Sequence, residues 1–362
     1  GDEFALLISR SQMSGRLLKF VDDLTHALKQ PLSYNKTDVQ CGASIGVRRI
    51  ESSATDVSAL MKEADLALLS AKSGGGGVWK EYSEGFKARI RGQRELAQDL
   101  AKAIETNSLK LQYQPIVDAK TGAVTGVEAL SRWYHPVRGT VSPSEFIPIA
   151  EDNGIIIELG DRVIENVIES AVEMPANTKI GINISPLQLH SSRILSVIQQ
   201  KLNDTGFDPC RVELEITESV FLSDNAFILD RLRKLKGSGV RIAMDDFGTG
   251  VSSLAYLQRF PFDNFKLEHA FVSVIETSDQ SRAIARATIS MAHARKLTGT
   301  AEGVENDMQA RFLREQGCDE LQGFLFSRPQ DQAALIPYLR SMEMVHEAKS
   351  SKGDNVVEMK RT

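Results

Sequence analysis

The chain has 362 residues, of which 42% are hydrophobic and 25% are charged, and its formal net charge is −5. These values are typical of a globular protein with about two domains. The acidic balance excludes a general attraction to DNA, RNA or an anionic membrane surface. No apolar run approaches the ~18 residues of a membrane-spanning helix, and no signal peptide leads the chain.

The cysteines indicate a reducing compartment. Cys41, Cys210 and Cys318 are far apart and lack the spacing of metal ligands, which favours free, buried thiols and a cytoplasmic protein. The chain has no starting Met, and its first residues already have the pattern of the middle of a domain. We therefore interpret it as a fragment, with room upstream for a membrane-anchored sensor.

Residues 1–83 have the pattern of a small α+β unit. Asp2 and Glu3 precede a strand-like apolar run, a helix is expected around 15–29, and a further strand and helix follow. These elements are too few to close a sheet, which indicates a partial domain. Residues 84–92 begin a charged helical pattern that we interpret as a connector.

Residues 93–343 have the pattern of strands that alternate with helices. Eight strands with intervening helices over ~250 residues match a TIM-like (β/α)8 barrel, with a doubly wound open sheet as the alternative. Residues 344–362 are polar and aperiodic, which predicts a disordered tail. The strand candidates begin near residues 109, 124, 179, 211, 240, 264, 298 and 321.

An acidic pair stands at the end of one predicted strand. The apolar run 242–244 leads into Asp245 and Asp246, and a loop with Gly248 and Gly250 follows. Neighbouring side chains of a pleated strand point to opposite faces, so both acids reach one site only where the backbone bends. Such carboxylates repel by roughly 1–4 kcal/mol, and a divalent cation is the usual remedy. An acidic turn without a ligand is the alternative.

In a (β/α)8 barrel, functional side chains gather at the carboxyl ends of the strands. Polar residues lie late in six of the predicted strands, whereas Gln322 lies early in the eighth and fits less well. One such residue is usually a core hydrogen bond, but six at the same end are hard to explain by packing. We therefore predict a shared site, formed by Glu128, Asn183, Glu215, Asp245, Asp246, Lys266 and Glu302.

The predicted site is rich in oxygen ligands and contains no histidine. This favours Mg²⁺ or Mn²⁺ over zinc, and five carboxylates exceed the need of one cation, which favours two. Two divalent cations suit phosphate-ester hydrolysis. Lys266 is a candidate to hold the attacking water or to stabilise charge on the phosphate, and the Arg132 guanidinium is a candidate to bind a phosphate.

Several motifs in this half of the chain resemble the EAL family of cyclic di-GMP phosphodiesterases. They are "YQPIV", "EALSRW", "NIS", "ELEITES", "DDFGTG", "AEGVE" and "LQGFLFS", in that order. The resemblance covers residues 93–343 and implies hydrolysis of cyclic di-GMP to linear pGpG on a TIM-like barrel with two Mg²⁺ or Mn²⁺ ions. It also implies a homodimer through this domain.

The resemblance implies a role for each matching residue. Asp246 would touch both metal ions. Glu302 and Lys266 would lie near the attacking water, which Gln322 would orient. Glu218 would hold the Asp-Asp-Phe-Gly loop in its active shape. The implied metal ligands are Glu128, Asn183, Glu215, Asp245, Asp246 and Glu302, and the implied substrate contacts are Gln114, Leu130 and Arg132.

Residues 1–83 resemble the C-terminal half of a GGDEF domain, the diguanylate cyclase fold. Residues 1–4, "GDEF", match the end of its signature, and "ASIGV" and "EADLALLSAKSGG" match a later strand and helix. The first signature glycine and a further metal aspartate are absent, and four glycines at 74–77 replace the usual Gly-Arg-Asn. We therefore expect a structural role without cyclase activity.

One position departs from the EAL pattern. The family usually has Lys-Ile-Asp where this chain has Lys266, Leu267 and Glu268. The extra methylene would shift a carboxylate by ~1.5 Å, and errors near 1 Å can cost ~10²-fold in rate, whereas a supporting role for Glu268 would tolerate the change. We expect an active enzyme. The alternative is a weak or silent cyclic di-GMP receptor module that signals through dimerisation.

Overall fold

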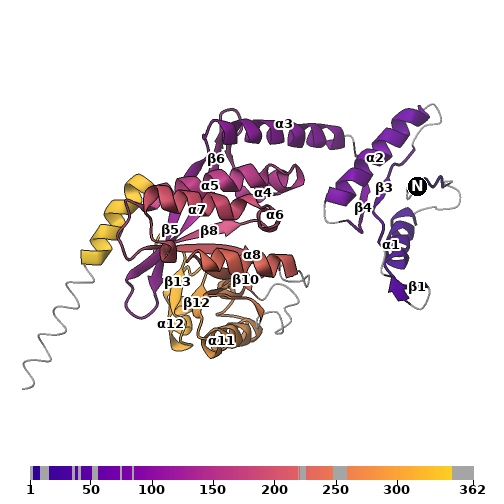
Figure 1. Cartoon of the computed structure of the whole chain (residues 1–362). Coiled ribbons are helices and arrows are strands. Elements are labelled where there is room, and N and C mark those ends of the chain that lie inside the picture. The colour runs from indigo at the N-terminus through magenta and orange to yellow at the C-terminus, as the bar shows by residue number, and fades with distance from the viewer. Residues whose placement is uncertain are drawn as a thin grey trace, which may run out of the picture. The chain divides into compact units, whose positions relative to one another are not determined.

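The chain divides into two compact units, Gly1–Gln98 and Asp99–Thr362, which Figure 1 shows. The predicted tail from residue 345 onward and the loop with Gly248 and Gly250 lie outside the described residues. No helix within the described stretches combines the length and apolar character needed to cross a bilayer. The computed structural model describes residues 3–8, 16–34, 37–39, 42–50, 56–73, 76–83, 85–218, 220, 226–247 and 259–344.

The first unit is a partial α+β domain, as predicted. Its elements are α1 (Leu17–Leu28), β1 (Leu32–Tyr34), β2 (Thr37–Val39), β3 (Ile45–Val47), α2 (Val57–Ser73) and β4 (Trp79–Glu81). Strands β1 and β2 pair antiparallel, and β3 and β4 pair in parallel. Its described core is small, because Ala67 of α2, Tyr82 and Phe86 form the buried cluster.

Helix α3 (Gly85–Glu105) includes residues 85–92 of the predicted connector and continues beyond them. Leu96, Leu100 and Ile104 recur every four residues and are buried, so one apolar face sustains the helix past residue 93. Ser108 ends it, because its backbone N–H and its hydroxyl both donate to the carbonyl of Ala103, at 2.9 and 3.2 Å.

Eight strands of the second unit close into a barrel. They are β5 (Lys110–Asp118), β6 (Val124–His135), β8 (Lys179–Ile184), β9 (Val212–Thr217), β10 (Arg241–Phe247), β11 (Asn264–Leu267), β12 (Thr298–Ala301) and β13 (Glu320–Gln322). Their order is β5-β13-β12-β11-β10-β9-β8-β6, and β6 pairs back onto β5. The predicted barrel is confirmed and the open sheet is wrong. Two short strands, β7 (Gly139–Val141) and β14 (Gln330–Asp331), pair with β6 and β5.

The first barrel strand runs against its neighbours. β5 is antiparallel to both β6 and β13, whereas the other barrel pairs are parallel. The connection from β5 to β6 is a tight turn in which Asp118 Oδ1 accepts hydrogen bonds from the backbone of Lys120 and Thr121, at 3.1 and 2.7 Å. A turn this short joins antiparallel strands only, so the barrel departs from the all-parallel TIM pattern here.

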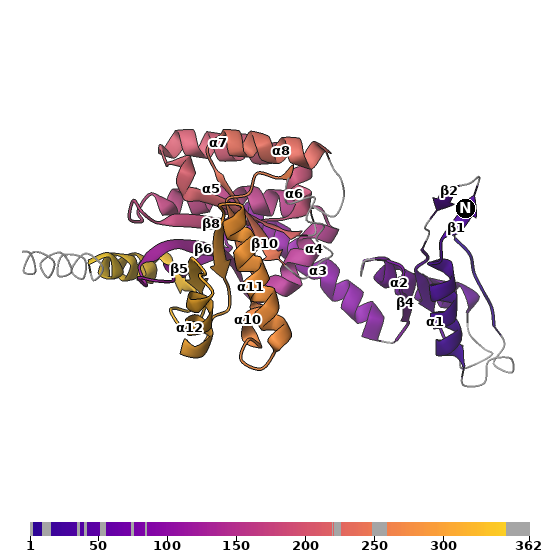
Figure 2. The same cartoon turned by 90° about the horizontal axis from the view of Figure 1, so that it is seen from below.

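Helices pack around the outside of the barrel, as Figure 1 and Figure 2 show. They are α4 (Pro143–Asp152), α5 (Ile156–Ala171), α6 (Pro186–His190), α7 (Arg193–Thr205), α8 (Ala226–Gly237), α10 (His269–Ser273), α11 (Asp279–Ala294) and α12 (Asp307–Glu315). Ile180, Ile182 and Ile184 of β8 join the main apolar cluster with Ile164 and Ile168 of α5. These isoleucines face the helices, and the residues between them in β8 therefore face the lumen of the barrel.

Candidate active site

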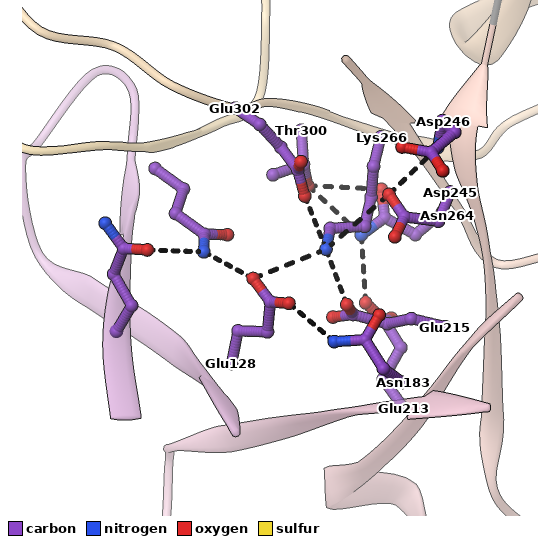
Figure 3. Close-up of polar contacts among 12 residues, drawn as sticks. Glu128, Asn183, Glu213, Glu215, Asp245, Asp246, Asn264, Lys266, Thr300 and Glu302 are labelled. Carbon is purple, nitrogen blue, oxygen red and sulfur yellow. Dashed lines mark hydrogen bonds and ion pairs between the residues drawn. The ribbon is translucent and has the colours of Figure 1, made fainter. Parts of the chain in front are cut away.

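Polar side chains from neighbouring strands meet inside one end of the barrel, as Figure 3 shows. The structure brings together all seven residues of the predicted shared site. Most stand late in their strands: Asn183 is fifth of six in β8, Lys266 is third of four in β11, and Glu302 directly follows β12. Glu128 lies only fifth in β6 but is next to last in the segment that pairs in parallel with β8.

Asp245 and Asp246 share the site because the backbone bends between them. Asp246 has a φ of +55°, which non-glycine residues rarely adopt, and its N–H donates to Asp245 Oδ1 at 2.9 Å. The pairing of β10 with β11 shifts register between Met244 and Phe247. The strand continues to Phe247, so an irregularity within the strand, and not its end, brings the two acids together.

Lys266 lies at the centre of the carboxylates. Its Nζ is 2.5 Å from Glu215 Oε2 and 2.5 Å from Glu302 Oε1. It is 3.7 Å from Glu128 Oε2 and 3.9 Å from Asp245 Oδ1. Lys266 is 1% exposed, and a charge buried this deeply requires charged partners. Four carboxylates against one ammonium leave a formal charge of −3.

Amide donors fix the Glu128 carboxylate. Asn183 Nδ2 donates to Glu128 Oε1 at 2.7 Å, and Gln322 Nε2 donates to Glu128 Oε2 at 2.6 Å. Gln322 Nε2 also lies 3.3 Å from Gln114 Oε1. Gln114 is itself anchored, because its Nε2 donates to the carbonyl of Ser327 at 3.1 Å.

Our expectation that Gln322 lies early in its strand is wrong. It is the last residue of β13, and so it occupies the same end as the other site residues. The apolar run "FLF" that suggested a longer strand leaves the barrel because Gly323 passes directly against the backbone of Val304, where a side chain would meet the Val304 carbonyl oxygen at 2.0 Å.

Burial and mutual repulsion control the charges of the site. Burial raises the pKa of Glu302 to about 8, and burial together with the neighbouring carboxylates raises the pKa of Glu215 well above its ordinary value. Burial disfavours the Lys266 ammonium, but the carboxylates outweigh it and raise the pKa of Lys266 well above its ordinary value. The site therefore needs more positive charge before every carboxylate ionises.

The donor set fits a hard divalent cation by charge and by ligand type. Carboxylate and amide oxygens are the ligands that Mg²⁺ and Mn²⁺ prefer, and Glu215 Oε1 is buried without a hydrogen-bond partner. As the side chains stand, the described residues contain no group of three or more acidic, histidine or cysteine side chains arranged to hold a metal ion.

The three predicted substrate contacts lie beside Glu128. Gln114 is its partner across the β5–β6 pair. Leu130 and Arg132 follow Glu128 at alternate positions of β6 and therefore share its face. Both are half-buried, and the Arg132 Nε donates to Gln112 Oε1 at 2.9 Å. One guanidinium, that of Arg132, thus lies on the same strand face as the Glu128 carboxylate.

Two further predicted residues lie close to Asp246. Burial raises the pKa of Asp246, with the charges of Asp245 and, more weakly, Glu218 in the same direction, and Glu218 is buried directly after β9. Glu268 is the N-cap residue of α10 and has a buried Oε2 without a hydrogen-bond partner. Burial and the charges of Asp246 and Asp245 raise its pKa as well.

Four buried polar residues of the lumen were missed by the sequence interpretation. They stand two positions before Glu215, Lys266, Glu302 and Gln322, and so on the same face of each strand. That spacing is the signal that could have found them. They are Glu213, Asn264, Thr300 and Glu320.

The fold and the site define an α/β-barrel protein with an acidic, oxygen-rich site inside one end of the barrel. Residues 97–329 match the family model for the EAL domain, and residues 1–77 match that for the diguanylate cyclase, GGDEF domain. The chain belongs to the EAL domain family, and a GGDEF match precedes the EAL domain.

Curated proteins are similar to this chain over most of its length. An uncharacterized signaling protein of Caulobacter vibrioides is 41% identical over 336 residues, which cover 92% of this chain and 42% of that protein. The bifunctional diguanylate cyclase/cyclic di-GMP phosphodiesterase MucR of Pseudomonas aeruginosa is 34% identical over 343 residues, 93% of this chain and 50% of MucR. A solved structure of the PaMucR phosphodiesterase in a c-di-GMP complex has a TM-score of 0.64 and 36% identity, and the match covers 67% of this chain and 99% of that one. The chain spans half, or less, of these two curated relatives.

Proposed function

We propose that this chain hydrolyses cyclic di-GMP to linear pGpG. The observation that carries the proposal is the set of four carboxylates between 2.5 and 3.9 Å from Lys266 Nζ inside one end of an EAL-family barrel. The names of relatives support it, because MucR and the Escherichia coli PdeR are cyclic di-GMP phosphodiesterases by name. The solved PaMucR phosphodiesterase complex contains c-di-GMP.

Two Mg²⁺ or Mn²⁺ ions are part of the proposal. When bound, they would supply Lewis-acid stabilisation of the phosphate oxygens and would acidify a water molecule. The added positive charge would favour the ionised carboxylates against the burial and the mutual repulsion that raise the pKa of Glu215. The residues that would hold the ions are Glu128, Asn183, Glu215, Asp245, Asp246 and Glu302.

The remaining side chains would bind and orient the reactants. The Lys266–Glu302 contact of 2.5 Å places a donor and an acceptor side by side, so the pair could hold one water molecule and receive its proton, while Gln322 fixes its orientation. Arg132 would bind a phosphate. In the reaction, the water oxygen bonds to phosphorus, one P–O bond of the ring breaks, and a proton passes to the leaving oxygen.

Glu268, Glu218 and the first domain have roles in the proposal as well. Glu268 would add a carboxylate beside Asp246, and Glu218 would support the loop that follows Phe247. We also expect a homodimer through the EAL domain, a cytoplasmic location and no cyclase activity in residues 1–83. The proposed enzyme would lower the concentration of cyclic di-GMP.

The decisive assay incubates the purified chain with cyclic di-GMP and Mg²⁺ or Mn²⁺, with Ca²⁺ as the comparison, and separates the products by chromatography. We expect pGpG with Mg²⁺ or Mn²⁺. Glu128→Gln removes a charge and sets an amide donor against Asn183 or Gln322, so its rate should fall at least ~10²-fold. A wild-type chain that binds cyclic di-GMP in Mn²⁺ yet releases no pGpG would contradict the proposal and favour the receptor.

Gly181 allows a second test of the same site. A Cβ at this position of β8 would lie 2.1 Å from Glu215 Oε1, so Gly181→Ala must displace the Glu215 carboxylate. Displacements near 1 Å cost on the order of 10²-fold in rate, and we expect that loss of hydrolysis. Gly299→Ala in β12 is the matched control, because its Cβ would meet no atom closer than 3.6 Å. Equal rates for the two variants would argue against a role of Glu215.

A further inference from the structure

A second set of polar side chains crosses the lumen one layer below the site. We call it the buried polar layer, and it consists of the buried residues Glu213, Asn264, Thr300 and Glu320 with the half-buried Lys179 and Arg241 at its ends. Asn264 and Thr300 are each 1% exposed, and the two carboxylates are nearly as buried. Figure 3 shows Glu213, Asn264 and Thr300 beside the residues of the site.

Asn264 is the hub of the buried polar layer. Its Nδ2 donates to Glu213 Oε1 at 2.9 Å and to Thr300 Oγ1 at 3.1 Å. The Thr300 hydroxyl lies 3.2 Å from Glu320 Oε2 and 3.2 Å from Asn264 Oδ1, and its one O–H group can donate a hydrogen bond to either oxygen. Cations close both ends of the chain of contacts, because Arg241 Nε lies 3.0 Å from Glu213 Oε2 and Lys179 Nζ lies 2.8 Å from Glu320 Oε1.

The layer repeats the connections of the site strand by strand. Lys266 joins β11 to β9 through Glu215 and to the segment directly after β12 through Glu302. Two residues earlier, Asn264 joins β11 to β9 through Glu213 and to β12 through Thr300. Among the described residues, backbone pairing links β11 to β10 and β12, and these side chains add direct contacts between β11 and β9.

An apolar layer would fill this space at lower cost. Each buried polar group must keep its hydrogen bonds or destabilise the fold, and buried ion pairs seldom stabilise more than apolar residues of the same size. Each of the six residues is hydrogen-bonded or ion-paired in spite of that cost. A requirement for precise distances between the strands accounts for such a layer, because supporting hydrogen bonds fix the residues that do the chemistry.

We propose that Asn264, held by Thr300 and Glu213, is a positioning residue that sets the distances from Lys266 to Glu215 and Glu302. The proposal rests on the proposed function, because those distances matter for the hydrolysis of cyclic di-GMP. Thr300 is the residue best suited to test the proposal. The substitution Thr300→Val removes the hydroxyl and leaves the shape of the side chain nearly unchanged. Thr300→Ser keeps the hydroxyl and should rescue.

The experiment compares kcat, KM and melting temperature for the wild-type chain, Thr300→Val, Thr300→Ser and Asn264→Leu. For Thr300→Val we expect kcat to fall ~10- to 100-fold with KM for cyclic di-GMP nearly unchanged, because substrate contacts lie on other strands. Thr300→Ser should keep a kcat close to that of the wild type. Thr288→Val is the matched control, since Thr288 is a buried threonine of α11 outside the lumen.

The outcomes separate this proposal from the proposed function. If the wild type forms pGpG and folded Thr300→Val has the same kcat but a lower melting temperature, the layer is merely structural and the positioning role is wrong. If the wild type forms no pGpG, the proposed function fails. The positioning role is then tested by the affinity for Mn²⁺, measured by electron paramagnetic resonance. Affinity ~10-fold weaker in Thr300→Val but not in Thr300→Ser would support positioning, and equal affinities would overturn it.

Discussion

Replacing Lys266 by Met should lower the melting temperature of the metal-free chain by roughly 10 °C and reduce hydrolysis of cyclic di-GMP by at least ~10³-fold. The ammonium is the only cation within 4.0 Å of Glu215 or Glu302 among the described residues. Removing one partner of a buried ion pair costs about 3–5 kcal/mol, because the remaining charges stay buried without compensation. Four carboxylates would remain.

Scanning calorimetry in a chelator, repeated with Mn²⁺, measures this effect. A divalent cation should restore part of the lost stability to Lys266→Met, because it replaces the missing positive charge. Lys234→Met is the matched control, since Lys234 pairs with Asp230 on the exposed surface of α8, where an ion pair contributes little. A Lys266→Met chain that melts with the wild type would show that Lys266 does not hold the carboxylates together.

The central position of Lys266 illustrates how far the sequence leads. Its place near the end of a predicted strand brought it into the shared site, because parallel strands of a barrel present their carboxyl ends together. The local pattern contains no distances, however, and so it could not show that one ammonium contacts carboxylates from β9 and from the segment after β12. Those contacts depend on which strands face each other across the lumen.

The missed features have the same origin. The direction of β5 depends on a turn closed by the Asp118 side chain, which an alternation of strands and helices does not encode. The buried polar layer was missed because Asn264 and Thr300 look like ordinary strand polar residues until the closed barrel brings them within 3.1 Å of each other. Asp246 was correctly expected at a bend, because only a bend lets adjacent acids share a site.

The stability of the metal-free chain should decrease as pH rises from about 5 to about 8, and Glu302→Gln should remove a large part of that decrease. Burial raises the pKa of Glu302 from its ordinary 4.5 to about 8. In this window the unfolded chain has lost the Glu302 proton while the folded chain still binds it. The contribution of Glu302 to the free energy of unfolding is therefore fully present below pH 4.5 and is lost as pH rises through the folded pKa. The stabilisation lost across this window is on the order of 5 kcal/mol.

Three other groups of the site do not oppose the expected loss of stability between pH 5 and 8. The raised pKa of Glu215 acts in the same direction as that of Glu302. The pKa of Lys266 is raised from 10.5, so its stabilising effect stays constant between pH 5 and 8. The pKa of Glu128 is lowered from 4.5, because Lys266 and the amide donors outweigh burial, so its effect is complete before the window begins.

Urea unfolding at several pH values, in a chelator, compares the wild type with Glu302→Gln. All other titratable groups are common to both proteins, so the difference between the two curves isolates Glu302. Saturating Mn²⁺ should flatten the wild-type curve, because a bound cation favours the ionised carboxylate. Parallel curves for the two proteins would mean that Glu302 ionises freely in the folded chain. The four carboxylates around Lys266 would then ionise without an additional cation. That result would remove one argument for the two metal ions in the proposed hydrolysis.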